Sequence, residues 1–332
     1  SATADGGGTL SAPMRPAPLA LPMPRDEITS EAESGGPPKD GIPAIDDPSF
    51  VTAEEATFLE SADIVFGLRH EGTVRAYPQR ILVQHEICND TVAGTPIAVT
   101  YCTLTGTVLG FRRDGTTFGV SGRLLNSNLI MYDRATETWW PQVLATSIPG
   151  PCNDAPTSRS LREFRLVWTT WARWRTRYPD TPVLSRETGF PRRYDSDPYG
   201  SYNPLGGYFR PDASPMFPAF DWRADLAPKA VVLGARTGAG AVAFEADRLR
   251  SAGLVEGTLG ETRVLAVADA SLGTGSVYRN PDDEAFASRD GRIVDGDGTD
   301  HAPDALPLDP IYAFDAMWFA WSGFYPETRL YA

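Results

Sequence analysis

Short runs of alternating apolar and polar residues recur through most of the chain, and this period of two predicts β-strands. Residues 64–68 and 73–77 flank Glu71-Gly72, a pair suited to a tight turn, so together they predict a hairpin. Pro78 then predicts the start of a short helix that ends at His85. Further strands are expected over residues 96–102, 107–112, 118–122 and 129–134.

Helical patterns are short and few. Residues 53–61 follow Thr52, a suitable N-cap, and place glutamates in the first turn, which predicts one helix. Residues 169–175 predict another, with Trp171 and Trp174 on the same face. The pattern as a whole therefore indicates a mainly β fold of the α+β type.

The strand pattern occurs twice along the chain. Residues 64–77 are echoed by residues 231–244, which share the same order of apolar positions and glycines. We interpret this as an internal duplication that produced two related strand-rich lobes, each closed by a short Trp-bearing helix. The closing segments also correspond, because Trp171, Trp174 and Tyr178-Pro179-Asp180-Thr181 match Trp318, Trp321 and Tyr325-Pro326-Glu327-Thr328.

These features divide the chain into four parts. Residues 1–46 form an extended tail rich in proline and glycine, and residues 47–185 form the first lobe. Residues 186–228 form an irregular, aromatic connector that we expect to pack on the surface, and residues 229–332 form a second, degenerate lobe. The tail is expected to pack either on its own body or on a neighbouring subunit, as in a homo-oligomer or filament.

Composition excludes some classes of partner. The chain of 332 residues has a formal net charge of −13, so it lacks the basic surplus that a nucleic acid requires. It has no run of roughly 18 apolar residues, so no transmembrane segment is expected. The sequence begins with Ser-Ala-Thr-Ala-Asp-Gly-Gly-Gly and no initiator Met, which suits the end left by signal-peptide removal and predicts an extracytoplasmic location, with an artificial start as the alternative.

The rarest reactive residues lie close together in the first lobe. His85-Glu86 includes one of only 3 histidines, and Tyr101-Cys102 includes one of only 3 cysteines. In the repeat, these pairs align with Ala252-Gly253 and Asp269-Ala270. A residue that the scaffold needs should occur in both copies. The contrast therefore indicates a site in the first lobe.

Three interpretations of this cluster remain open. Cys102 and His85, with Met131 as a third ligand, are suitable donors for copper or zinc. The same pair suits a Cys–His nucleophile, with Glu86 and Asp90 orienting the histidine or acting as general acid and base. Alternatively, Cys102 and His85 are buried structural residues. Three cysteines allow at most one disulfide and leave an odd thiol.

Several motifs stand out along the chain, namely Asp40-Gly41-Ile42-Pro43-Ala44, Arg75-Ala76-Tyr77-Pro78, His85-Glu86-Ile87, Asn89-Asp90, Tyr101-Cys102-Thr103-Leu104-Thr105-Gly106, Phe118-Gly119-Val120-Ser121-Gly122, Met131-Tyr132-Asp133-Arg134, Trp140 with Gln142, and Tyr178-Pro179-Asp180-Thr181. In these motifs the chain resembles the DUF3179 family, a domain of unknown function. The resemblance implies no established activity. Thr103 stands where the family usually has proline, and Thr105 stands where some members have a second cysteine. No CxxC pair exists, which argues against dithiol redox chemistry.

The sequence therefore predicts an exported protein with a metal-binding, redox-capable Cys/His site in its first lobe. One alternative is a structural subunit of a cell-surface or extracellular assembly, in which the N-terminal tail contacts a neighbour. A second alternative is a Cys-dependent hydrolase or transferase.

Overall fold

The computed structural model describes residues 18–332, and its first lobe consists of two β-sheets. Their strands are β2 (Phe50–Val51), β3 (Ile64–His70), β4 (Thr73–Pro78), β5 (Ile87–Val92), β6 (Thr95–Cys102), β7 (Thr107–Arg112), β11 (Glu163–Phe164), β12 (Val167–Thr170) and β13 (Val183–Leu184). One sheet has the order β12-β3-β4-β13-β2 and the other β11-β7-β6-β5. The prediction of a mainly β fold is confirmed.

The second lobe has the same strand order. Its strands are β16 (Val231–Thr237), β17 (Gly240–Glu245), β18 (Leu254–Leu259), β19 (Thr262–Asp269), β20 (Thr274–Arg279), β24 (Pro310–Ile311), β25 (Ala313–Met317) and β26 (Arg329–Tyr331). They form sheets of order β25-β16-β17-β26 and β18-β19-β20-β24. In each lobe the last strand joins its sheet in parallel, β13 beside β4 and β26 beside β17.

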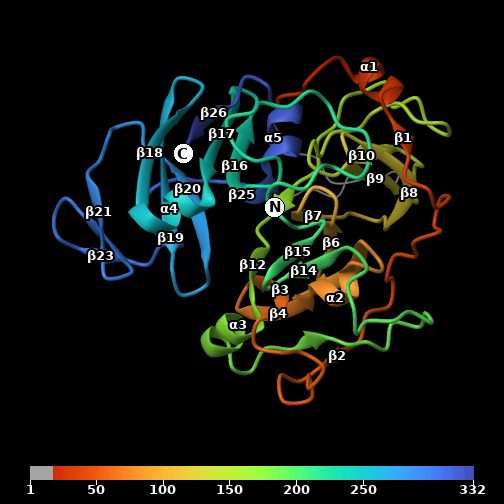
Figure 1. Ribbon diagram of the computed structural model, residues 1–332, viewed down its shortest axis with the longest axis horizontal. Helices are drawn as coiled ribbons and strands as arrows, with labels where there is room; N and C mark the ends of the chain where they lie inside the picture. Colours follow the sequence, from red (N-terminus) through yellow and green to blue (C-terminus); the bar gives the residue numbers. More distant parts are fainter. Residues whose placement is uncertain (1–17) are drawn as a thin grey trace.

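Three smaller strand groups lie outside this shared arrangement. They are the sheet β1 (Glu33–Ser34), β8 (Phe118–Leu125), β9 (Asn128–Asp133) and β10 (Trp139–Pro141), the sheet β21 (Phe286–Arg289), β22 (Arg292–Asp295) and β23 (Asp300–His301), and the hairpin β14 (Gly200–Tyr202) and β15 (Leu205–Gly207). Figure 1 shows the second lobe and its small sheet beside the first lobe, with β8–β10 on the far side of the first lobe.

The helices are short. They are α1 (Arg25–Ser30), α2 (Gln79–Leu82), α3 (Trp171–Arg177), α4 (Ala246–Ala252) and α5 (Trp318–Phe324). Within residues 18–332, none of them has the length and apolar character needed to cross a membrane. The helix predicted over residues 53–61 is wrong, because this segment forms turns. Ala53, Ala56 and Leu59 are buried in these turns, and the amide of Leu59 donates to the carbonyl of Ala56, three residues back, at 3.2 Å.

The tryptophan helices hold the sheets in the same way in both lobes. Trp174 packs over Gly67 of β3, and Trp321 packs over Gly234 of β16. A β-carbon at either glycine would overlap the indole ring. Each indole N–H also donates to a threonine hydroxyl at 3.0 Å. These contacts explain why each lobe needs both the glycine and the tryptophan.

The described part of the N-terminal tail packs on its own chain. Ile28 of α1 is fully buried, β1 pairs with β8, and the amide of Ala20 donates to the carbonyl of Thr237 in the second lobe. The contact of the tail with a neighbouring subunit stays a prediction, and its first 17 positions lie outside the described residues. The connector also packs on the body, as expected, and buries Tyr208 and Phe209.

Candidate functional site

The first lobe has unusual backbone geometry at Glu86, which links α2 to β5. Its φ of 63° lies in the left-handed region, which residues with a β-carbon seldom adopt. The amide of Glu86 donates to the carbonyl of Leu82 at 2.7 Å, and the carbonyl of Glu86 accepts from the amide of Tyr101 at 2.7 Å. These two bonds end the helical turn and attach it to β6.

The second lobe has glycine at the corresponding point. Gly253 has a φ of 77°, and its carbonyl accepts from the amide of Ala268 at 2.9 Å. Glycine adopts this conformation without steric cost, whereas other residues lose roughly 1–2 kcal/mol. The first lobe thus has a glutamate where glycine would be more stable. Other turn residues, such as Glu71 and Ala93, also have positive φ, so the contrast with Gly253, and not the conformation alone, singles out the Glu86 side chain.

Cys102 is the last residue of β6, on the strand beside Glu86. Its register with β7 matches the register of Asp269 with β20. The counterpart of Cys102 is therefore Asp269, and the predicted alignment with Ala270 is wrong by one residue. Because side chains alternate across a strand, that shift would have turned the counterpart to the opposite face.

Glu86, Cys102 and Tyr199 lie close enough for their charges to affect one another. Burial raises the pKa of the Glu86 carboxyl to about 7. Burial also raises the pKa of the Cys102 thiol, and the negative charge of Glu86 raises it further. The pKa of Tyr199 rises to about 12 through burial and the same charge. A carboxyl with a pKa near neutral pH thus lies within the range at which its charge affects the thiol.

The side chains of Glu86 and Cys102 differ in solvent exposure and in hydrogen bonding. Glu86 remains partly accessible to solvent, and no residue of the described chain donates a hydrogen bond to its carboxyl. Cys102 is only 1 % exposed, and its Sγ lies 3.6 Å from the carbonyl oxygen of Ser127, a weak hydrogen bond. The carboxyl is therefore free to exchange protons, whereas the thiol is covered.

A buried polar network supports the turn that follows Cys102. Asn128 Nδ2 donates to Thr105 Oγ1 at 3.1 Å, and Thr105 Oγ1 lies 2.8 Å from Thr107 Oγ1. Thr107 Oγ1 donates to Gln142 Oε1 at 2.7 Å, and Gln142 Nε2 donates to Thr100 Oγ1 at 3.0 Å. All five side chains are buried. Because every member has a partner, the network holds the turn in one conformation.

A polar cleft of about 200 Å³ lies beside Tyr101, the neighbour of Cys102. Gln79 and Tyr202 line this cleft, and both contact the Tyr101 hydroxyl, at 3.2 Å and 2.7 Å. Gln79 Nε2 also donates to Asp197 Oδ2 at 2.9 Å, and burial raises the pKa of Asp197. The cleft is therefore joined to the Cys102 strand by a chain of hydrogen bonds.

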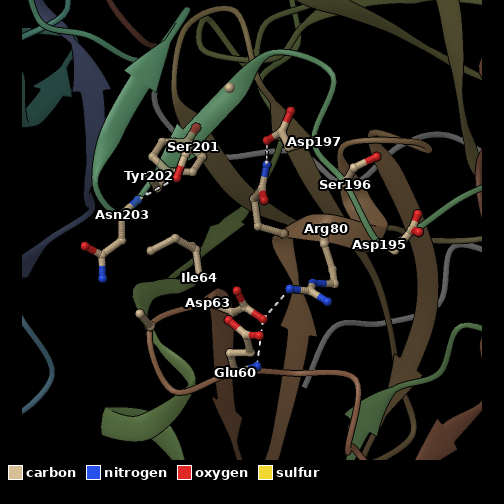
Figure 2. A pocket seen from close by; sticks show the side chains of 13 residues that line it. Glu60, Asp63, Ile64, Arg80, Asp195, Ser196, Asp197, Ser201, Tyr202 and Asn203 are labelled. Atoms are coloured by element: carbon tan, nitrogen blue, oxygen red, sulfur yellow. Dashed lines mark hydrogen bonds and ion pairs between the residues drawn. The ribbon is translucent and has the colours of Figure 1, made fainter.

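The opposite end of the cleft holds an ion pair. Arg80 Nη2 donates to Asp63 Oδ2 at 2.5 Å, and the amide of Glu60 donates to the same oxygen at 2.8 Å. Figure 2 shows this pair at one end of the cleft and Asp197 at the other, with Tyr202 along one side. A ligand here would meet charged groups of both signs.

His85 is engaged on both sides of its ring. Its Nδ1 lies 2.7 Å from the carbonyl oxygen of Pro43, and its Nε2 lies 2.5 Å from the hydroxyl of Tyr194. Burial lowers its pKa, which favours the neutral ring. The structure thus does not bring an imidazole nitrogen of His85 to the thiol of Cys102. His85 instead ties the segment around residue 43 to the connector.

Asp90 and Met131 also lie in separate surroundings. Asp90 Oδ2 accepts from Arg75 Nη1 at 2.7 Å and from the Tyr77 hydroxyl at 2.5 Å. Met131 is fully buried in an apolar cluster that also contains Cys102. Within residues 18–332, no group of three or more His, Cys, Asp and Glu side chains is placed to hold a metal ion. Of the residues predicted for the site, Glu86 and Cys102 lie near enough for the charge of Glu86 to raise the pKa of the thiol.

Comparison with protein families identifies the chain. The family model described as "Protein of unknown function (DUF3179)" matches residues 39–328. The chain belongs to this family. The match covers both lobes and the connector, so the resemblance predicted from the motifs is confirmed for most of this DUF3179 chain. Comparisons with curated proteins and with solved structures gave no match.

The contribution of the connector to this region of the DUF3179 chain was not predicted from the sequence. Tyr199 and Tyr202 approach Cys102 and Tyr101 from a segment about 100 positions further along the chain. Tyr208 closes the same region, because its hydroxyl donates to the carbonyl of Leu104 at 2.6 Å. The aromatic composition of residues 192–209 was the available signal. That composition indicated packing but could not indicate where the tyrosines pack.

Proposed function

We propose that the first lobe of this DUF3179 protein is a Cys-dependent hydrolase or transferase that acts on activated acyl groups. Cys102 is the nucleophile and Glu86 is the general base and acid. The observation that supports this best is the left-handed Glu86, whose carboxyl has a pKa of about 7 and whose charge acts on the Cys102 thiol. A group with that pKa both accepts and returns a proton near neutral pH.

The reaction proceeds in two stages. The Sγ–H proton of Cys102 moves to the Glu86 carboxylate as the sulfur bonds to the acyl carbon. The tetrahedral adduct then expels its leaving group, which takes the proton back from Glu86. In the second stage water, or another nucleophile in a transferase, attacks the acyl carbon and breaks its bond to sulfur. The thiol is then regenerated, and no redox partner is needed.

The polar cleft and the connector provide the route for substrate. Cys102 is 1 % exposed, so a substrate reaches it only when a covering side chain moves. Tyr202 both lines the cleft and hydrogen-bonds Tyr101, so its displacement would open a path from the cleft toward Cys102. Arg80 and Asp197, at the two ends of the cleft, would orient a polar part of the substrate.

We further infer that the two lobes arose by internal duplication and that the second is a scaffold. Their shared strand order, their parallel closing strands and their Trp–Gly contacts support this inference. At the reacting positions the second lobe has Gly253 and Asp269 in place of Glu86 and Cys102. That pair lacks a thiol, so acyl transfer through sulfur is confined to the first lobe.

The donor geometry gives less support to a copper or zinc site made by His85, Cys102 and Met131. A ligand histidine needs one ring nitrogen free for the metal. Both nitrogens of His85 are hydrogen bonded, to Pro43 and Tyr194. Metal binding would require His85 to break one of these bonds and turn toward Cys102.

Acetylation by p-nitrophenyl acetate tests the proposed function. The experiment uses the Cys152→Ser chain, because Cys152 is exposed and would react without catalysis. We expect one acetyl group on Cys102, located by mass spectrometry of peptides, and release of one equivalent of nitrophenolate. Glu86→Gln should slow acetylation at pH 7.5 by about 100-fold or more, since general base catalysis contributes on that scale.

Two further variants keep the result interpretable. Glu256→Gln changes an exposed glutamate of the second lobe and should leave the rate unchanged. Cys102→Ala should abolish labelling. Acetylation at other residues only, or labelling of Cys102 at the same rate in Glu86→Gln, would contradict the assignment.

A further inference from the structure

The two lobes meet around a second cavity, of about 390 Å³, which shares no lining residue with the polar cleft. Its walls come from β11 and β12 of the first lobe and from β20 and β24 of the second. Interfaces between structural units are common places for ligand sites, and this volume lies within the range of small-molecule pockets. The apolar part of the lining includes Phe164, Trp174, Tyr178, Leu272, Val277 and Ile311.

Arg165 places a positive charge in this apolar wall. Its Nη atoms donate to the carbonyl of Ala313 at 2.5 Å, to Thr274 Oγ1 at 2.8 Å and to the carbonyl of Gly275 at 2.8 Å. These partners are neutral, and within residues 18–332 no carboxylate lies within ion-pair distance of Arg165. Burial accordingly lowers its pKa, although the charge of the buried Asp315 acts in the opposite direction.

Tyr312 adds a second polar group to the cavity, a hydroxyl without a hydrogen-bond partner. It lines the same cavity, and its hydroxyl is the one buried side-chain polar atom without a hydrogen bond in the described part of the chain. A buried hydroxyl without a partner costs roughly 1–3 kcal/mol. Arg165 precedes β12 and Tyr312 precedes β25, so the two residues approach the cavity from corresponding points of the two lobes.

The acidic residues of the lining are already paired. Glu163 binds Arg236 in a buried ion pair, and Asp304 lies 3.6 Å from Arg69. The carboxylate of Asp269 accepts from the amide and hydroxyl of Ser271, at 3.0 Å and 2.7 Å. Asp269 thus has neutral partners. Of the two guanidinium groups in the lining, Arg69 faces Asp304, whereas Arg165 has no carboxylate within ion-pair distance among the described residues.

We propose that this inter-lobe cavity binds a small organic anion with an apolar, ring-containing body and a carboxylate or sulfonate head. The head accepts hydrogen bonds from Arg165 and from the Tyr312 hydroxyl, and the body packs against Phe164 and Ile311. Charge-assisted hydrogen bonds of this kind are the strong ones in proteins. The site is separate from Cys102 and does not depend on the acyl chemistry proposed there.

Fluorescence titration with 8-anilinonaphthalene-1-sulfonate tests the proposal. This probe has a ring-containing body and a sulfonate, and its emission rises in an apolar site. We expect saturable binding of one molecule per chain. Tyr312→Phe removes only the hydroxyl and should weaken binding about threefold to tenfold. N-phenyl-1-naphthylamine, which has similar rings without the sulfonate, should bind at least about tenfold more weakly.

A blocking variant locates the probe. Val167→Trp fills the cavity from β12 and should reduce binding by more than about tenfold, whereas Val231→Trp places the same ring at an exposed position and should have no effect. Circular dichroism checks that both variants fold. Absence of binding to the native chain, equal binding in Val167→Trp, or equal affinity for the uncharged probe would each overturn the proposal.

Discussion

The two lobes share one backbone plan but differ at a few positions in one region. The hairpins β3–β4 and β16–β17 and the three-stranded runs β5–β7 and β18–β20 have matching order and register. Along this frame, the first lobe has Glu86 and Cys102 where the second has Gly253 and Asp269. The shared positions show what the fold requires, and the differing positions show what it does not.

Glu86 is the most informative of these differences. The fold at this point requires a left-handed residue, and Gly253 meets that requirement at no steric cost. Glu86 meets it at a cost and also places an acidic group in a poorly solvated position, where its pKa rises to about 7. Both features lower stability. A side chain that is unfavourable in two independent ways is best explained by its chemistry.

The largest expected effect on stability concerns a feature that both lobes share, the buried tryptophan that packs over a strand glycine. Trp174→Ala and Trp321→Ala each remove a buried indole that packs over a strand glycine. Each should lower the free energy of unfolding by about 4 kcal/mol, because loss of a large aromatic leaves a cavity. Urea denaturation followed by circular dichroism measures the change.

The matched control is Trp222→Ala, since Trp222 is 41 % exposed, and its effect should stay below about 1 kcal/mol. If Trp174→Ala cost as little as this control while Trp321→Ala cost several kcal/mol, the two tryptophans would not be equivalent. The tryptophan helix would then stabilise the second lobe but not the first.

The next effect depends on pH and arises only in the first lobe. The Glu86 pKa is about 7 in the folded chain against an ordinary value of 4.5, so between these pH values the folded state binds the extra proton. The contribution of the Glu86 carboxyl to the free energy of unfolding is therefore fully present below pH 4.5 and is lost as the pH rises through 7. The shift corresponds to about 3 kcal/mol. Glu86→Gln should raise the free energy of unfolding by up to that amount at pH 8 and change it little at pH 4.

Parallel denaturation of wild type and Glu86→Gln at several pH values measures this difference directly. Other titrating groups contribute equally to both proteins and cancel. Glu256→Gln, at an exposed position of the second lobe, should give a difference that does not change with pH. A flat difference for Glu86→Gln as well would show that its carboxyl titrates normally in the folded chain.

Local sequence patterns predicted the strands well because hairpins are encoded by neighbouring residues. Glu71-Gly72 both adopt positive φ, as a tight hairpin turn requires, and β3 and β4 form around them. The helix expected over residues 53–61 failed for a physical reason. Thr52 does accept a hydrogen bond from the Glu55 amide at 3.2 Å, as an N-cap would. After Ala56, however, the amides of Thr57 and Leu59 donate to carbonyls two and three residues back, so the i to i−4 pattern of an α-helix does not continue.

The candidate site was only partly predictable. Closeness in sequence indicated one hairpin for these residues, and the backbone of Glu86 does pair with Tyr101, the neighbour of Cys102, at the start of the β5–β6 pair. The same closeness wrongly suggested a contact between His85 and Cys102, since it does not fix which way a ring points. The tyrosines of the connector arrive through long-range packing, for which residues 186–228 contain no periodic signal. Export of the protein stays a prediction.

The smallest effect separates backbone strain from side-chain charge. At pH 4.5 the Glu86 carboxyl is mostly protonated in the folded chain, so the energetic penalty that remains is mainly the left-handed backbone. Glu86→Gly gives the first lobe the residue of the second and should raise the free energy of unfolding by about 1 kcal/mol. Urea denaturation at this single pH measures the gain.

Glu86→Ala is the matched control, because alanine also lacks the carboxyl but keeps the β-carbon that makes the left-handed conformation costly. Its stability at pH 4.5 should stay close to that of wild type. The reciprocal change, Gly253→Ala, should cost at least about 1 kcal/mol, and more if Ser288 cannot move away from the new methyl group. Equal gains from Glu86→Gly and Glu86→Ala would assign the instability to the glutamate side chain. The left-handed backbone at residue 86 would then cost little. The carboxyl with its pKa near 7 would be the feature that distinguishes this position from Gly253.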